Sequence, residues 1–143
     1  MNPFISNPRV LALIVALWYF FIGYGSAVLD PSLPARMRFA WRVAAWIACF
    51  VAFAIHIGFL RFKFRKSPLS TALNVSMAVA LGGFLLAVAA TIHAAMVPSH
   101  APYWQFLIAL IVWPLITALP AFVVALPTAW LLTRFPRQAN GRS

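Results

Sequence analysis

The chain has 143 residues, of which 64% are hydrophobic and 8% are charged. A soluble domain of this length covers an apolar core with charged side chains, and eleven basic residues beside one acidic residue cannot supply that cover. The composition excludes an ordinary soluble domain and predicts an all-α integral membrane protein. We expect a single membrane domain over residues 1–143, folded as a four-transmembrane-helix bundle with short loops.

The first apolar run covers about residues 10–29 and is predicted to cross the membrane. About twenty helical residues span a hydrocarbon layer ~30 Å thick. A cleaved signal peptide is the alternative, because Arg9 precedes the run and Gly25, Ser26 and Ala27 resemble a small-residue cleavage site. The run is long for the apolar region of a signal peptide, so we favour a membrane span.

The second apolar run covers about residues 40–60, beyond a break at Asp30 to Pro34. The stretch after it predicts a cytoplasmic basic loop over residues 61–71, in which cations alternate with Phe62 and Phe64. This alternation lets the rings enter the membrane interface while the cations meet anionic lipid headgroups. The predicted lipid-contacting residues are Arg61, Lys63, Arg65 and Lys66.

A third helix is predicted over about residues 72–97, with Ser70 or Thr71 as its N-terminal cap. An uncharged turn bounded by Pro98 and Pro102 ends it, and a fourth helix follows over about residues 104–132. This last run is longer than one perpendicular crossing requires, so we expect it to be tilted, kinked or partly interfacial. Residues 133–143 form a polar C-terminal tail.

The distribution of Lys and Arg predicts the orientation in the membrane. Arg9, the four cations of the 61–66 segment and the three arginines of the tail make eight on one side, against three in the first loop. The larger cluster is expected on the cytoplasmic side, which places both termini there and is typical of a bacterial inner-membrane protein. Three arginines of the first loop favour the opposite orientation, and they are Arg36, Arg38 and Arg42.

The net charge of +10 is also typical of nucleic-acid-binding proteins. Here the cations stand in short clusters between apolar runs, which predicts no nucleic-acid partner and favours the lipid bilayer and anionic lipid headgroups as partners. The single cysteine, Cys49, lies within an apolar run. One chain therefore offers neither a disulfide nor a cysteine-based zinc site, and we predict no metal site.

Two rows of small residues recur at four-residue spacing, as in helices that pack closely in lipid. We expect them to join the second and third helices as a close hairpin, and a homo-oligomer or a partner membrane subunit is the alternative use. The second-helix row is Ala44, Ala48 and Ala52, followed by His56. The third-helix row is Gly83, Ala87, Thr91 and Ala95.

His56 and His93 are the titratable side chains expected well inside the spans, so they are the candidate cofactor-binding residues, with haem as the candidate cofactor. They are expected near opposite membrane faces, roughly 20 Å apart, which is too far for one iron. Hydrogen bonding to a neighbouring helix is the plainer interpretation. A second candidate site would bring Asp30, His93 and His100 together on the outer side.

The fourth helix contains Pro114, Pro120 and Pro127, which are predicted to kink it. Transporters use broken helices to coordinate ions, but no acidic or basic residue is expected deep in a span here. No nucleophile, base and orienting residue stand at a catalytic spacing. We therefore predict a non-enzymatic accessory or structural membrane subunit, with a haem-binding anchor of an electron-transfer complex and a small transporter or channel as alternatives.

Overall fold

The structure, a computed structural model, describes residues 7–96 and 102–134, and of Asp30 only the backbone. Its long helices are α1 (Pro8–Leu29), α2 (Ala35–Gly58), α3 (Pro68–Met96) and α4 (Tyr103–Leu131). Two short elements, η2 (Asp30–Ser32) and η3 (Phe59–Lys63), adjoin α2. All four helices are long and apolar enough to cross a membrane, and no strand occurs in the described ranges. The predicted all-helical class is confirmed.

The basic loop is shorter than we predicted. Helix α2 continues directly into the π-helical turn η3, and α3 begins at Pro68, so residues 64–67 replace the expected loop over 61–71. Proline suits the first turn of a helix because its ring fixes φ and it has no N–H to satisfy. Arg65 reverses the chain with a left-handed φ of 51°, and the Arg61 guanidinium donates to the carbonyl oxygen of Lys66 across the turn.

Ser67 caps α3. Its hydroxyl oxygen accepts the Ser70 N–H at 3.2 Å, and its carbonyl oxygen accepts the Thr71 N–H at 2.9 Å. The prediction of Ser70 or Thr71 as the cap was wrong, because α3 starts one turn before its continuous apolar run begins. A cap oxygen satisfies one of the backbone donors that a helix start leaves without a partner.

We expect Ser67→Ala to lower the free energy of unfolding by about 1 kcal/mol, since the cap hydrogen bond is lost. Ser70→Ala is the matched control, because it removes a hydroxyl three residues later that caps nothing. Denaturant unfolding of both variants in the same detergent compares them. If Ser70→Ala lowers the free energy of unfolding more than Ser67→Ala does, α3 instead starts at the position predicted from the hydropathy pattern.

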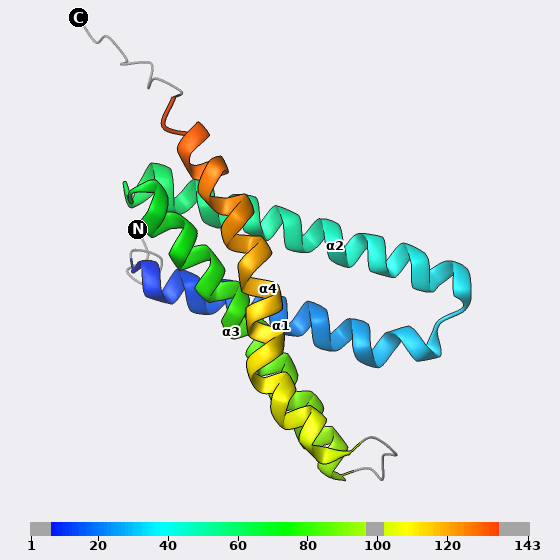
Figure 1. Ribbon diagram of the computed structural model, residues 1–143. Coiled ribbons are helices and arrows are strands. Elements are labelled where there is room, and N and C mark those ends of the chain that lie inside the picture. The colour runs from blue at the N-terminus through cyan, green and yellow to red at the C-terminus, as the bar shows by residue number, and fades with distance from the viewer. Residues whose placement is uncertain (1–6, 97–101, 135–143) are drawn as a thin grey trace, which may run out of the picture.

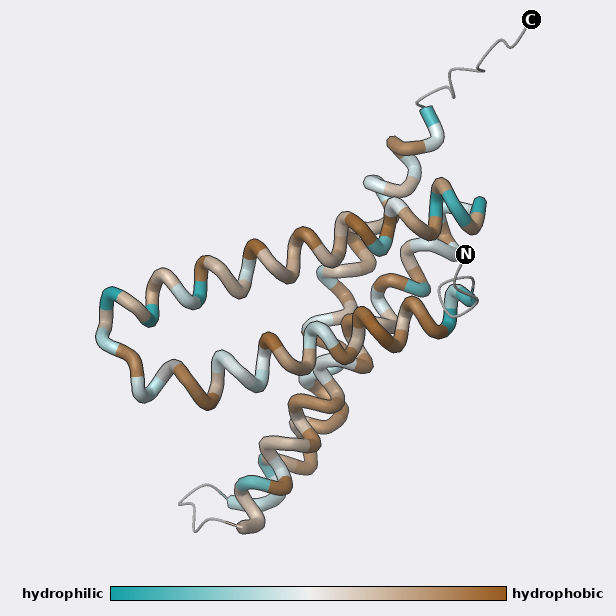
Figure 2. The backbone as a smooth tube through the Cα atoms, turned by 180° about the vertical axis from the view of Figure 1, so that it is seen from behind, coloured by the Kyte–Doolittle hydropathy of each residue, from teal (hydrophilic) through white to brown (hydrophobic). Residues whose placement is uncertain are grey.

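The helices are arranged as two hairpins, α1 with α2 and α3 with α4 (Figure 1). The hairpins meet where α1 begins, where the α2–α3 turn lies and where α4 ends, and they diverge toward their tips (Figures 1 and 2). The predicted four-helix bundle with short loops thus takes the form of an open V (Figure 1). We call the meeting point the closed end. A small apolar core fills it, made of Ile57, Leu60, Ala72, Val75 and Ala125.

Two consecutive glycines of α3 let α1 and α4 pack closely against it. A β-carbon on Gly82 would lie 2.8 Å from Tyr19 Cβ and 2.9 Å from the carbonyl oxygen of Ala16, both on α1. A β-carbon on Gly83 would lie 2.8 Å from Thr117 Oγ1 on α4. Successive helical positions point about 100° apart, so the pair lets α1 and α4 approach two different faces of α3.

The small-residue rows do not join α2 to α3 as we expected. Gly83, Ala87 and Thr91 are buried, and the Thr91 hydroxyl reaches the carbonyl oxygen of Phe106 on α4 at 3.4 Å. Ala95, the last member of that row, is exposed. In α2, Ala44 is exposed while Ala48 and Ala52 are half-buried. Small residues permit close packing in lipid without specifying the partner helix, and here α3 packs along α4 and across α1.

Candidate functional site

A cleft of about 590 Å³ lies between the two hairpins, near the middle of each helix. All four helices contribute to its walls. This volume is in the range of ligand-binding clefts in proteins. Its lining consists of Tyr19, Ile22 and Gly23 of α1; Ala45, Trp46, Cys49, Phe50 and Phe53 of α2; Val79, Gly82, Gly83 and Leu86 of α3; and Trp113, Thr117, Pro120, Ala121 and Val124 of α4.

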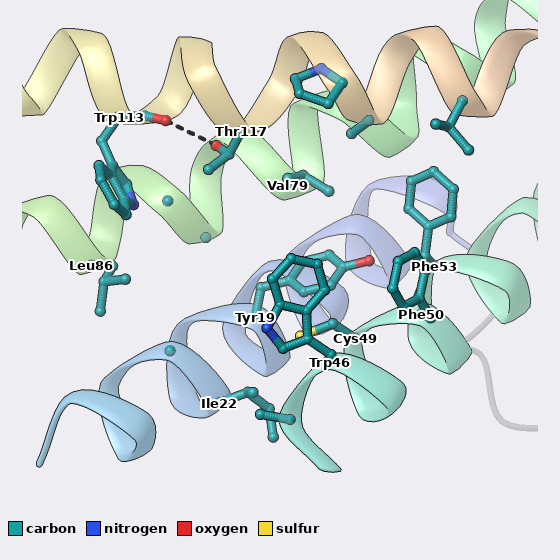
Figure 3. Close-up of a pocket in the computed structure, with 17 residues that line it drawn as sticks. Tyr19, Ile22, Trp46, Cys49, Phe50, Phe53, Val79, Leu86, Trp113 and Thr117 are labelled. Carbon is teal, nitrogen blue, oxygen red and sulfur yellow. Dashed lines mark hydrogen bonds between the residues drawn. The ribbon is translucent and has the colours of Figure 1, made fainter. Parts of the chain in front are cut away.

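The cleft is almost wholly apolar. Among the described residues its lining includes no carboxylate, imidazole, ammonium or guanidinium group. Its polar side-chain groups are the hydroxyls of Tyr19 and Thr117, the thiol of Cys49 and the indole N–H groups of Trp46 and Trp113. The Thr117 hydroxyl is already engaged, since it donates to the carbonyl oxygens of Trp113 and Pro114 at 3.0 Å (Figure 3). The Tyr19 hydroxyl is buried and has no hydrogen-bond partner among the described residues. The site therefore offers surface for apolar packing and no evident acid–base pair.

Aromatic side chains form the α2 wall of the cleft. Trp46, Phe50 and Phe53 project from α2 toward α3 and α4 (Figure 3). The rings of Trp46 and Phe50 are tilted against each other with centroids 6.2 Å apart. Trp46 is 67% exposed and Phe50 is 62% exposed, so the protein itself leaves most of this wall uncovered.

A shallow groove lies on the surface of α2 beside the cleft, and all the residues that line it belong to that helix. Trp46 and Phe50 belong to the linings of both the groove and the cleft. Arg42 is the one charged residue in the lining of the groove. The remaining residues that line it are Phe39, Val43 and Ile47.

The two histidines lie at opposite ends of the molecule. His56 is near the end of α2, at the closed end, with 0% of its surface exposed and both ring nitrogens without a partner among the described residues. His93 is exposed near the end of α3, at the tip of the other hairpin. The structure does not bring them together, and neither lines the cleft. Within residues 7–96 and 102–134, no three His, Cys, Asp or Glu residues gather as metal ligands.

The alternative site on the outer side is not assembled. Asp30 begins η2, at the tip of the α1–α2 hairpin, whereas His93 is close to the tip of the α3–α4 hairpin. These tips diverge (Figures 1 and 2), so the structure does not bring the two residues together. His100 lies outside the described residues.

The predicted lipid-contacting cations differ in their surroundings. Arg61 is half-buried and tied to the Lys66 carbonyl, while Lys63 lies over the rings of Phe59 and Phe64, with its Nζ 5.7 and 5.8 Å from the ring centroids. Arg65 is exposed. An ammonium over an aromatic face is stabilised by the ring quadrupole. Contact of these cations with lipid headgroups stays a prediction.

Helix α4 continues through all three of its prolines. Pro114 and Pro127 lie outside the cleft lining, and Pro120 is part of it. Each proline removes one backbone donor, and hydroxyl groups nearby bond to other carbonyl oxygens of the helix, as Thr128 does to Val124 at 2.7 Å. Kinks at these prolines stay a prediction. Helix α4 forms one wall of the cleft.

Comparisons with protein-family models, with curated proteins and with solved structures found no match for this chain.

Proposed function

We propose that the chain is a small polytopic protein of the bacterial inner membrane and that it acts as a non-enzymatic accessory or structural subunit. Four helices of spanning length support insertion in the membrane. The observation that carries the functional part is the cleft, which all four helices line and which contains no charged side chain. Such a surface binds by apolar packing, so the protein works by receiving an apolar component of the membrane between its hairpins.

We place both termini in the cytoplasm. The start of α1, the α2–α3 turn and the end of α4 lie together at the closed end (Figure 2). Among the described residues this end carries the larger group of cations, which the positive-inside rule assigns to the cytoplasm. The cleft then opens toward the periplasmic face. The cations of the closed end are Arg9, Arg61, Lys63, Arg65, Lys66 and Arg134.

Cys49 provides a direct test, because it is the single cysteine of the chain and lines the cleft. A nitroxide attached to Cys49 of the chain in lipid vesicles is expected to be accessible to oxygen and inaccessible to a water-soluble nickel complex. The physical reason is that an apolar cleft open to the bilayer admits apolar solutes and excludes hydrated ones. Power-saturation electron paramagnetic resonance measures both accessibilities.

Two controls in a Cys49→Ser background calibrate this measurement. A label at Ser32→Cys in the α1–α2 turn should be more accessible to the nickel complex. A label at Phe21→Cys on the exposed side of α1 should be more accessible to oxygen. If the label at Cys49 is more accessible to the nickel complex than to oxygen, the result would contradict the proposal and support a water-filled pathway. A C-terminal alkaline phosphatase fusion that is active would contradict the proposed orientation, since that enzyme folds only outside the cytoplasm.

The two alternative functions have less support. A haem-binding anchor needs an accessible imidazole, and His56 is fully buried while His93 is exposed near the end of α3, away from His56. A Soret band that appears when haem is supplied and disappears in His56→Ala or His93→Ala would revive it. A transporter or channel rests on the prolines of α4. Of these Pro120 lines the cleft, and the described residues of the lining offer no charged group to carry an ion.

A further inference from the structure

We propose that the two hairpins close on each other when the cleft is empty, so that the aromatic wall of α2 packs on the facing surface of α4. The open V is then one of two states of the fold, and it is the state that can receive the apolar component of the proposed function. Closure itself concerns the empty chain, so the inference goes beyond that function.

The facing walls of the cleft differ in the size of their side chains. The α2 wall carries Trp46, Phe50 and Phe53, which project toward α3 and α4 (Figure 3). The largest side chains of the opposite wall, Leu86 and Trp113, stand at the end of the cleft away from Phe53 (Figure 3). Large rings on one surface and small residues on the other allow the two surfaces to interdigitate. The glycines and alanine of the opposite wall are Gly82, Gly83 and Ala121.

The two walls also share one helical repeat. The three rings of α2 recur at spacings of four and three residues, and so do Thr117, Ala121 and Val124 of α4. Cys49 lies on the same face of α2, three residues after Trp46. Side chains at this spacing form a continuous stripe, and two such stripes match when the helices lie side by side.

The contacts between the hairpins permit this movement. Among the described residues they are concentrated at two places, the core of the closed end and the crossing of α1 over α3, where Ala16 and Tyr19 meet Gly82. Two rigid bodies that touch at two places keep one rotation, about the line that joins those places. Rotation of packed elements about such an axis is a common form of conformational change. Here it moves α2 toward α4 and leaves both contacts in place.

Packing favours the closed state of an empty cleft. The gap between the hairpins narrows toward the closed end, where Phe53 packs against the core (Figure 1). Atoms that line a gap too narrow to be filled lose their dispersion contacts. Such contacts drive the association of helices in lipid, so joining the two walls stabilises the protein.

Disulfide trapping with the natural Cys49 tests the inference in the full chain in lipid vesicles. Thr117→Cys or Ala121→Cys adds a second thiol on the facing surface of α4, and the two positions are one helical turn apart. Helices packed about 8–10 Å apart bring facing Cα atoms to roughly 4–6 Å, the separation that a disulfide requires. We therefore expect an oxidant to form an intramolecular disulfide in at least one of these variants, detected by mass spectrometry of the monomer.

Two exposed positions of α4 are the matched controls. Leu119→Cys and Val123→Cys each lie two residues from a lining position and outside the cleft, so neither should crosslink to Cys49 of the same chain. Controls that crosslink as readily as the lining positions would overturn the inference. The absence of an intramolecular disulfide at both lining positions would also overturn it.

Double electron–electron resonance measures the movement without a crosslink. Labels at Ser32→Cys and Met96→Cys, in a Cys49→Ser background, report the separation of the two hairpin tips. We expect two distance populations. Ala121→Phe adds a ring to the surface that α2 is to cover and should cause loss of the shorter distance, whereas Val123→Phe on the exposed side should retain it. A single narrow distance that Ala121→Phe leaves unchanged would overturn the inference.

The failure of this inference is distinguishable from the failure of the proposed function. A single tip distance, with a Cys49 label that is more accessible to oxygen than to the nickel complex, would overturn closure and support a rigid apolar cleft. Two tip distances, with a Cys49 label that is more accessible to the nickel complex, would support closure and overturn the proposed function.

Discussion

Replacing Gly82 with alanine should lower the free energy of unfolding by about 1 to 2 kcal/mol. The new β-carbon would lie 2.8 Å from Tyr19 Cβ and 2.9 Å from the Ala16 carbonyl oxygen, and neither atom is the end of a flexible side chain. Helix α1 must therefore move away from α3. Overpacking of this kind costs about 1 to 3 kcal/mol, and the gain of about 1 kcal/mol from the higher helix propensity of alanine offsets only part of it.

Two other glycines serve as controls for this prediction. A β-carbon on Gly23 would lie 3.1 Å from a terminal methyl of Leu86, which can rotate, and one on Gly58 would meet only Phe62 at 4.0 Å. We expect Gly58→Ala to be neutral or slightly stabilising and Gly23→Ala to change stability by less than about 1 kcal/mol. Unfolding of all three variants in one detergent compares them. If Gly82→Ala matches Gly58→Ala, the crossing of α1 and α3 is not as close as described.

Replacing His56 with leucine should raise the free energy of unfolding by about 1 to 2 kcal/mol. The imidazole is fully buried, and neither ring nitrogen has a partner among the described residues. A buried polar group without a hydrogen bond costs about 1 to 3 kcal/mol, and leucine fills a similar volume without that cost. Equilibrium unfolding in detergent measures the change.

His93 is the matched control for this variant. It is exposed near the end of α3, so His93→Leu should change stability by no more than about 0.5 kcal/mol in detergent. A destabilised His56→Leu protein would mean that the imidazole binds a group that the chain acquires in the membrane. In that case the histidine, and not the cleft, would become the first candidate for function.

The helices themselves could be predicted from the sequence because membrane spans need a fixed length of apolar residues. Helix α4, at Tyr103–Leu131, differs by one residue at each end from the predicted 104–132. The end of α2 was less predictable. Cations and aromatic residues after Leu60 were interpreted as a loop, whereas they extend the helix by a π-helical turn, because such side chains tolerate the membrane interface without ending a helix.

The partners of the helices could not be predicted, for a physical reason. In lipid there is no hydrophobic driving force to distinguish one apolar face from another, so a row of small residues indicates close packing and leaves the partner open. The row that begins at Gly83 was identified, but it packs on α4 rather than α2. Gly82, one residue earlier, was not identified, although it determines the approach of α1.

The cleft was missed for the same reason. Trp46, Phe50 and Phe53 stand in an ordinary apolar run, and nothing in their spacing separates a wall of a cleft from a surface that faces lipid. These residues line one cleft because the two hairpins diverge and leave a space between them. Arg42, which lines the groove beside the cleft, was interpreted from the sequence as a topology signal.

The V of the two hairpins gives the protein different widths in the two halves of a bilayer. Its helices meet at one end and diverge at the other, so a chain inserted as proposed occupies less area in the cytoplasmic leaflet than in the periplasmic leaflet (Figure 1). A wedge of this shape relieves packing stress where the periplasmic leaflet is the convex one. The protein should therefore concentrate on membrane regions that bulge outward.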